Sequence, residues 1–201
     1  VANWLEDEAT VQRLAKAYDG IRGRFSPENY TNDIPYMWAA YYVAQNTYKA
    51  QFVLSRVLRA MSEIPDEFYI VDVGTGVGPT VWAAVDYLRI LENLYHIYGE
   101  KPFFSKAEII GIEPSQDSRR VYEEIREHYV PEDGVPQSLV VHPVKSVYAG
   151  RAGWLDCIPN DKPAIVFFSN MLSEFRSDQE RENTVTACWH HLHSDSVLAL
   201  I

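Results

Sequence analysis

The chain has 201 residues, which is enough for one domain with a substantial buried core. Its residues are 47% hydrophobic and 23% charged, the composition of an ordinary globular protein. A formal net charge of −10 argues against a broad nucleic-acid-binding surface, because such surfaces carry an excess of Lys and Arg, although a local basic patch stays compatible with it. No apolar run approaches the roughly 20 residues that a membrane-spanning helix needs.

The first third of the chain has the pattern of helices. Residues 4–19 place apolar side chains on one face of a helix, and residues 35–62 do so over a longer stretch that is rich in aromatic side chains. Residues 20–27 contain two glycines and a proline, so we expect a loop between the two helices. We predict that residues 1–66 form a helical cap over one edge of a sheet and that residues 67–201 form an α/β domain.

The rest of the chain alternates short apolar runs with helical patterns. Strands are predicted at 68–73, 108–113, 138–143, 164–169 and 196–201, and helices at 79–98, 115–128 and 178–193. This alternation is typical of a doubly wound, mostly parallel, Rossmann-like sheet. The last strand has no partner after it, so we expect a piece of a longer protein whose C-terminal strands are missing.

The motif Asp72-Val73-Gly74-Thr75-Gly76-Val77-Gly78 follows the first predicted strand. Glycines let a backbone approach a ligand closely, and the start of the next helix offers free N–H groups, so the motif predicts a cradle for an adenine-nucleotide-like ligand. A nicotinamide-binding turn has the spacing G-x-G-x-x-G, but Pro79 stands where its last glycine belongs. A phosphate-binding loop requires Gly-Lys-Ser/Thr, which is absent here. An acid two residues before the first glycine suits a cationic amino-acid ligand instead.

Two further segments end predicted strands, where ligands bind in open α/β sheets. Glu113 ends the second strand, where an acid can accept hydrogen bonds from ribose hydroxyls, and a helix-capping or surface glutamate is the alternative interpretation. The run Ser169-Asn170-Met171-Leu172-Ser173-Glu174 ends the fourth strand. Its polar side chains are candidates to face a substrate, while turn and helix-cap roles are the alternative for Ser173 and Glu174.

The motif D-x-G-x-G-x-G after an apolar strand resembles the first motif of class I S-adenosylmethionine-dependent methyltransferases. The resemblance implies S-adenosylmethionine as cofactor, bound at the carboxyl ends of the first two strands. The implied cofactor-binding residues are Asp72, Gly74, Thr75, Gly76, Gly78, Glu113 and Pro114. Catalysis would then rest mainly on positioning the donor and the acceptor. The implied contacts to the acceptor come from Ser169, Asn170 and Glu174.

A narrower similarity concerns the methyltransferase family associated with the mitochondrial small ribosomal subunit. It rests on Tyr30-Thr31 before an aromatic helix, residues 76–84, Glu113-Pro114-Ser115 and residues 169–174. The chain departs from that family in its acidic charge and in lacking the cysteine metal ligands of some members. It also lacks the Asn/Asp-Pro-Pro-Tyr/Phe run of amino-methylating nucleic-acid enzymes and the Pro-Cys nucleophile of cytosine C5 methylases. The acceptor therefore stays open among a protein, an RNA and a small molecule.

No metal site is expected from the remaining residues. Cys157 and Cys188 are too few and too far apart for a metal or disulfide framework, so we expect free thiols in a reducing compartment, the cytoplasm. The histidines at 190, 191 and 193 lack the i, i+4 spacing of a zinc helix, and His142 is interpreted as a packed or solvent-facing side chain. The sequence predicts a methyltransferase, with a non-catalytic binding or assembly module of the same fold as the alternative and a nicotinamide-dependent dehydrogenase disfavoured.

Overall fold

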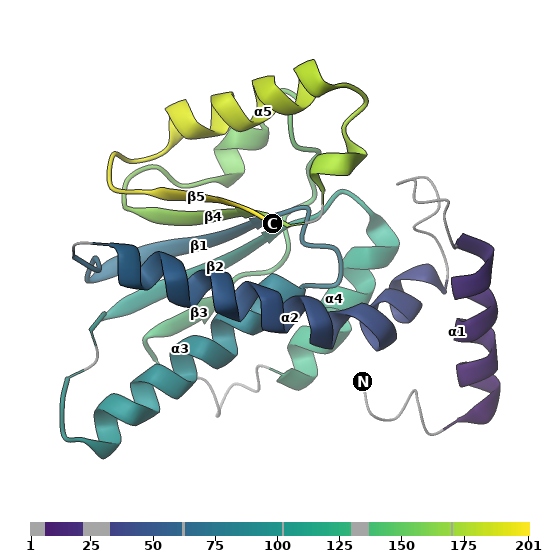
Figure 1. Ribbon diagram of the computed structural model, residues 1–201, viewed down its shortest axis with the longest axis horizontal. Helices are drawn as coiled ribbons and strands as arrows, with labels where there is room; N and C mark the ends of the chain where they lie inside the picture. Colours follow the sequence, from purple (N-terminus) through teal and green to yellow (C-terminus); the bar gives the residue numbers. More distant parts are fainter. Residues whose placement is uncertain (1–6, 22–32, 62, 102, 130–136, 170) are drawn as a thin grey trace.

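The computed structural model describes residues 7–21, 33–61, 63–101, 103–129, 137–169 and 171–201, and its centre is one five-stranded sheet (Figure 1). The strands are β1 (Glu67–Val73), β2 (Lys106–Ile112), β3 (Leu139–Val141), β4 (Ala164–Phe168) and β5 (Val197–Leu200). They are paired in the order β3-β2-β1-β4-β5, and every pairing is parallel. The predicted doubly wound, Rossmann-like fold is confirmed.

Helices cover both faces of this sheet (Figure 1). The helices are α1 (Glu8–Ile21), α2 (Ile34–Ala60), α3 (Pro79–Ile97), α4 (Gln116–Tyr129) and α5 (Asp178–His191), with short 3-10 helices η3 (Trp154–Cys157) and η4 (Leu172–Glu174). The second, third and fourth helices lie over one face, and α5 lies over the other (Figure 1). Among the described residues, no helix is both long and apolar enough to cross a bilayer.

The side chains of β1 alternate between two hydrophobic layers, as the period of two along a strand requires. Phe68 and Ile70 belong to the layer under α2, α3 and α4, whereas Tyr69, Val71 and Val73 belong to the layer under α5. All five side chains are buried. Because both faces are covered, the strand is apolar at nearly every position, which is the pattern that made it recognisable in the sequence.

The N-terminal helices differ in how they meet the sheet. The C-terminal half of α2 packs Leu54 and Leu58 into the same layer as Phe68, so this helix lies over a face of the sheet rather than over an edge. Leu14 of α1 packs instead against Met37 of α2 in a separate small cluster. The first helix therefore packs on α2, and α2 packs on the sheet.

The third strand is shorter than the sequence predicts, because only Leu139–Val141 joins the ladder. The N–H of His142 still donates to the carbonyl of Ile109 at 2.9 Å, but Pro143 follows and has no N–H to continue the pairing. Contact with β2 resumes at Lys145, which forms a parallel bridge with Ile112. The proline thus explains why the predicted strand does not extend to residue 143.

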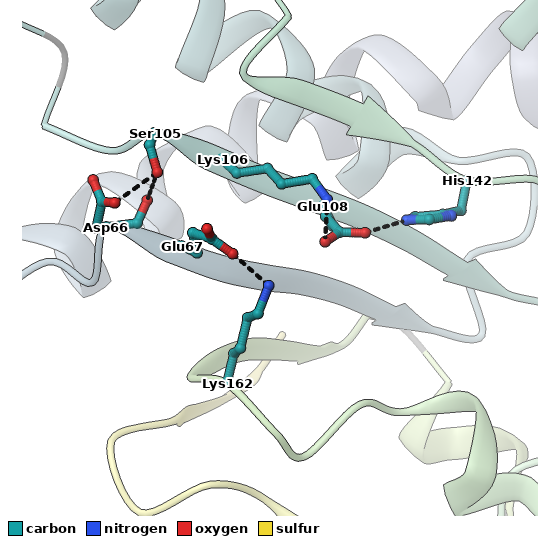
Figure 2. Close-up of polar contacts among 7 residues, drawn as sticks. All are labelled: Asp66, Glu67, Ser105, Lys106, Glu108, His142 and Lys162. Carbon is teal, nitrogen blue, oxygen red and sulfur yellow. Dashed lines mark hydrogen bonds and ion pairs between the residues drawn. The ribbon is translucent and has the colours of Figure 1, made fainter.

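Charged side chains connect neighbouring strands, with Glu67 and Lys106 at the amino ends of β1 and β2 and His142 directly after β3 (Figure 2). Glu108 accepts hydrogen bonds from Lys106 and from His142, each at 2.8 Å, and Glu67 pairs with Lys162, which precedes β4. Partial burial raises the pKa of Glu108, but the bonds from Lys106 and His142 outweigh it and hold that pKa below its ordinary value. These contacts account for His142 as a packed, half-buried residue directly after β3.

The packing of α2 on the sheet predicts which of its side chains stabilise the fold. Leu54→Ala removes a side chain that is fully buried, so we expect the free energy of unfolding to fall by about 2–5 kcal/mol in denaturant titrations. Gln45→Ala, on the exposed side of the same helix, should change it by less than about 0.5 kcal/mol. Equal effects of the two substitutions would contradict this packing of α2.

Candidate functional site

The order of the strands places one crevice at the carboxyl edge of the sheet. Strand β1 lies between β2, which follows it in the chain, and β4, so the winding direction reverses between β1 and β4. Helices that leave the two strands on opposite faces leave a gap beside such a reversal, and ligands of open α/β sheets bind there. The glycine motif follows β1 directly and therefore lies at this position.

The glycine turn is held by β2 through its backbone. The N–H groups of Gly74 and Thr75 both donate to the carbonyl of Ile112, at 2.9 and 3.0 Å, and the N–H of Gly78 donates to the carbonyl of Thr75 at 2.9 Å. Gly74, Gly76 and Gly78 have φ angles of 74°, 57° and 91°, in the left-handed region that favours glycine. The alternating glycines in the sequence are thus explained by backbone conformation.

The three glycines differ in what surrounds them. A β-carbon at Gly74 would lie 2.8 Å from the side chain of Met171, and one at Gly78 would lie 2.6 Å from the indole of Trp82. A β-carbon at Gly76 would meet no atom of the described residues within 4 Å. Two of the glycines therefore allow close internal packing, and Gly76 is the one at which a ligand can approach the backbone.

Glu113 joins the glycine turn to the end of β2. Its Oε2 accepts the N–H of Gly76 at 2.8 Å, and its Oε1 accepts the N–H of Ser115 at 2.7 Å. Burial raises the pKa of Glu113 to about 7, although both N–H groups act in the opposite direction. The residue therefore bonds the start of the next helix, as a capping glutamate would, and also lies beside the open glycine. Each carboxylate oxygen retains a lone pair for a further donor.

Asp72 is the second carboxylate of the site and is 1% exposed. Neither of its oxygens has a hydrogen-bond partner among the described residues. Burial raises the pKa of Asp72 to about 7, and the nearby hydroxyls of Thr75, Ser169 and Thr80 lower it only in part. Because an unpaired buried carboxylate is costly, this group is suited to a cation or a hydrogen-bond donor that approaches the turn.

Gly111 makes room for the polar residues beneath the turn, and the sequence analysis did not single it out. It pairs with Asp72 across β1 and β2, and a β-carbon on it would lie 3.0 Å from the Thr75 methyl and 3.4 Å from the Tyr122 hydroxyl. The hydroxyls of Thr75 and Tyr122 are buried and, like Asp72, have no partner among the described residues. An isolated glycine inside an apolar strand was the available signal of such a close approach.

The segment after β4 contacts the glycine turn and the start of α3. The Ser169 hydroxyl lies 2.9 Å from the hydroxyl of Thr80, near the start of α3, and both side chains are buried. Met171 covers Gly74, and the exposed Glu174 lies in η4, close enough to Glu113 for its charge to raise the pKa of that residue. Asn170, the remaining candidate for acceptor contact, lies outside the described residues.

Arg119 positions the start of the second βα turn and was also missed from the sequence. Its guanidinium donates to the backbone carbonyls of Glu113 and Pro114. Pro114, a predicted cofactor-binding residue, is half-buried and offers its carbonyl to this contact. The signal available in the sequence was an arginine in the first turn of a helix that begins three residues after the acid.

The described residues contain no group of three His, Cys, Asp or Glu side chains that could hold a metal ion. Cys157 is half-buried and Cys188 is buried, and both are free thiols. Burial raises the pKa of Cys188 to about 12, so this thiol is uncharged at neutral pH. The polar groups that the described site offers are the carboxylates of Asp72 and Glu113, hydroxyls and backbone N–H groups.

No protein-family model matches the chain, and a comparison with curated proteins finds no match. Solved structures do resemble it. A protein of Methanococcus maripaludis, described as an S-adenosyl-L-methionine-dependent methyltransferase, has a TM-score of 0.49 at 8% identity, over 84% of this chain and 61% of its own. DesVI of Streptomyces venezuelae scores 0.48 at 15% identity, over 85% of this chain and 58% of its own.

A third structure is an S-adenosylmethionine-dependent methyltransferase from Clostridium acetobutylicum, with a TM-score of 0.46 at 11% identity, over 94% of this chain and 55% of its own. The chain therefore spans between half and two thirds of the length of these solved structures. Because these TM-scores are below 0.5, the likeness does not assign a function to the chain, and any assignment depends on the residues of its own site.

The different surroundings of the glycines predict different costs of substitution. Gly78→Ala combines left-handed backbone with a clash against Trp82 and Tyr122, so we expect it to lower the free energy of unfolding by about 2–5 kcal/mol. Gly76→Ala meets open space and should cost about 1–2 kcal/mol from its backbone alone. Denaturant titration of both variants checks the order, and a larger loss in Gly76→Ala would contradict the described geometry.

The two raised carboxyl pKa values predict how stability depends on pH. Between about pH 4 and pH 7 the folded chain retains the Asp72 and Glu113 protons that the unfolded chain has lost. The free energy of unfolding should therefore fall as pH rises through this window, by up to about 1.4 kcal/mol per unit for each group, and then level off. In denaturant titrations at several pH values, Asp72→Asn should remove about half of the decrease.

Glu113→Gln is the matched variant for this measurement, and it should remove the other half. The double variant should be nearly independent of pH where these two groups titrate. A decrease that persists unchanged in Asp72→Asn would show that Asp72 ionises normally in the folded chain.

Proposed function

We propose that the chain binds S-adenosylmethionine at the carboxyl edge of its sheet and transfers the methyl group to an acceptor. One arrangement carries this proposal. Gly76 is the open glycine of the turn, and Glu113 reaches its N–H from the end of the next strand. The buried carboxylate of Asp72, directly before the turn, has no hydrogen-bond partner among the described residues. This arrangement meets the two needs of the ligand, which are an anion for its amino-acid end and acceptors for its ribose hydroxyls.

The residues of the site fit this cofactor in three ways. A β-carbon at Gly76 would fill the space into which the turn opens, so the chain keeps that space free. The carboxylate of Asp72 would compensate the positive charge of the ligand's aminium group. In return, the buried carboxylate oxygens would gain the partner that they lack among the described residues. Glu113 has acceptor capacity left on each oxygen for a ribose hydroxyl. When bound, S-adenosylmethionine supplies a methyl group on a sulfonium centre that is already activated for transfer.

The chain's own contribution to the reaction is orientation and handling of one proton. Glu174 is proposed to accept the proton that an attacking hydroxyl or amine of the acceptor loses, because its carboxylate is exposed. Ser169 is buried and bonded to Thr80, so in our proposal it orients the end of β4 and does not itself remove a proton. Asn170 is proposed to contact the acceptor, since it stands between these two residues in the chain.

A non-catalytic binding module is the second candidate function, and the burial of Ser169 favours it. Of the three residues proposed to contact the acceptor, Ser169 is 7% exposed and already hydrogen-bonded, which leaves Glu174 as the accessible group among the described ones. In this alternative the cofactor stabilises the fold and no methyl group is transferred. The two candidates share the cofactor site and differ only in turnover.

Isothermal titration calorimetry tests the cofactor assignment. We expect S-adenosylmethionine to bind with micromolar affinity and NAD not to bind, because Pro79 stands where a dinucleotide turn has glycine. Asp72→Asn should weaken binding by about tenfold or more, since it removes the charge that faces the cation. Affinity in the wild type should rise about tenfold between pH 6 and pH 8, as Asp72 ionises from its pKa of about 7, and this rise should shrink in Asp72→Asn.

Gly76→Ala and Asp161→Ala complete this test as a pair. Gly76→Ala should keep its fold and lose affinity, whereas Asp161→Ala, an exposed residue before the amino end of β4, should bind normally. Binding of NAD in place of S-adenosylmethionine would overturn the proposal. Binding without transfer of labelled methyl to any component of a cell extract would favour the non-catalytic module.

A further inference from the structure

The solvent side of α2 is basic and aromatic, although the whole chain has a net charge of −10. Between Ile34 and Ala60 the helix contains Lys49, Arg56 and Arg59 but no Asp or Glu. Its exposed aromatic and positively charged side chains are Tyr41, Tyr48, Lys49, Phe52, Arg56 and Arg59. Their spacings place them on one side of the helix, opposite to the buried Leu54 and Leu58. These six residues are called the α2 stripe below.

The three positive charges of the α2 stripe are not neutralised within the described chain. None of Lys49, Arg56 and Arg59 takes part in an ion pair with a carboxylate there. Lys49 donates only to the amide oxygen of Asn46, at 3.4 Å, and Arg56 lies over the ring of Phe52, 5.2 Å from its centroid. Unpaired cations gathered on a net acidic molecule are complementary to a polyanion.

The rings of the stripe add a second kind of complementarity. Tyr48 is 74% exposed and Phe52 is 55% exposed, so most of each ring is in contact with water. They are four residues apart, which separates them by about 6 Å along the helix axis, and Arg56 continues the series one turn later. Exposed rings between cations form a platform on which the bases of a single strand stack while its phosphates meet the charges.

The part of α2 that carries Tyr48 contacts the start of α3, next to the glycine turn. The hydroxyl of Thr47 donates to the carbonyl of Pro79 at 3.1 Å, and Pro79 is the first residue of α3, directly after Gly78. Tyr48 follows Thr47 in the helix. From there α2 runs along the face of the sheet towards β1 (Figure 1). A nucleic-acid strand bound along the stripe would therefore pass the segment of α2 that contacts the start of α3.

We propose that the α2 stripe binds a single-stranded nucleic acid, with Lys49, Arg56 and Arg59 contacting phosphates and Tyr48 and Phe52 stacking on bases. A membrane surface fits less well, because interfacial helices insert aliphatic and aromatic side chains as a continuous face, and no Leu, Ile or Val of α2 is exposed. The bound nucleic acid would then be the methyl acceptor, an identification that rests on the proposed function. Binding of the nucleic acid to the stripe does not depend on it.

Fluorescence anisotropy with a labelled single-stranded RNA of mixed sequence tests the proposal. We expect a dissociation constant in the micromolar range. The logarithm of the association constant should fall with the logarithm of the salt concentration with a slope of about −2, the value for three phosphate contacts on a single strand. The triple variant Lys49→Gln, Arg56→Gln, Arg59→Gln should bind at least tenfold more weakly and with a slope near zero. Tyr48→Ala with Phe52→Ala should bind about tenfold more weakly with the slope unchanged.

The control removes three positive charges elsewhere, as Lys16→Gln, Lys101→Gln and Arg176→Gln, and should retain at least half of the affinity. No binding of RNA, equal loss in the control and the stripe variant, or preference for anionic vesicles over RNA would each overturn the proposal. Calorimetry with S-adenosylmethionine on the same variants separates the two proposals. The stripe variants should bind the cofactor normally, so RNA binding can fail or succeed independently of cofactor binding.

Discussion

The burial of Asp72 is the constraint on which the rest of the site depends. A carboxyl group at the end of a fully covered strand raises the energy of the fold unless it stays protonated or meets a positive partner. The surrounding structure accommodates it through the absence of a side chain at Gly111 and through hydroxyls of neighbouring elements. The unpaired carboxylate therefore destabilises the folded chain, and a bound cation would reduce this destabilisation. Such a local cost in stability is common at binding sites.

The glycine turn and Glu113 are mechanically coupled to that carboxylate. The turn is bonded to the last carbonyl of β2, Glu113 follows on the same strand, and its side chain returns to the N–H of Gly76. A displacement of β2 would thus move both the acid and the turn. The helices matter to the site because they hold the two strands in register: α2, α3 and α4 share one core with β1 and β2.

Much of the fold was predictable because its signals are local. Apolar runs gave the five strands, and the left-handed angles of the turn account for the alternating glycines that marked the site. The third strand was predicted too long, because the prediction extended it to Pro143, which has no N–H to continue the pairing with β2. The contact partners of the site were not predictable: Thr80 meets Ser169, and Met171 covers Gly74, only because distant segments converge at the edge of the sheet.

Hydrogen–deuterium exchange with and without S-adenosylmethionine is the most direct test of the central claim that the turn after β1 is the cofactor cradle. We predict slower exchange in peptides that cover residues 74–82 and 113–118, no protection of those peptides by NAD, and no protection in Asp72→Asn at the same ligand concentration. Protection confined to other segments, or equal protection by NAD, would contradict this account of the site.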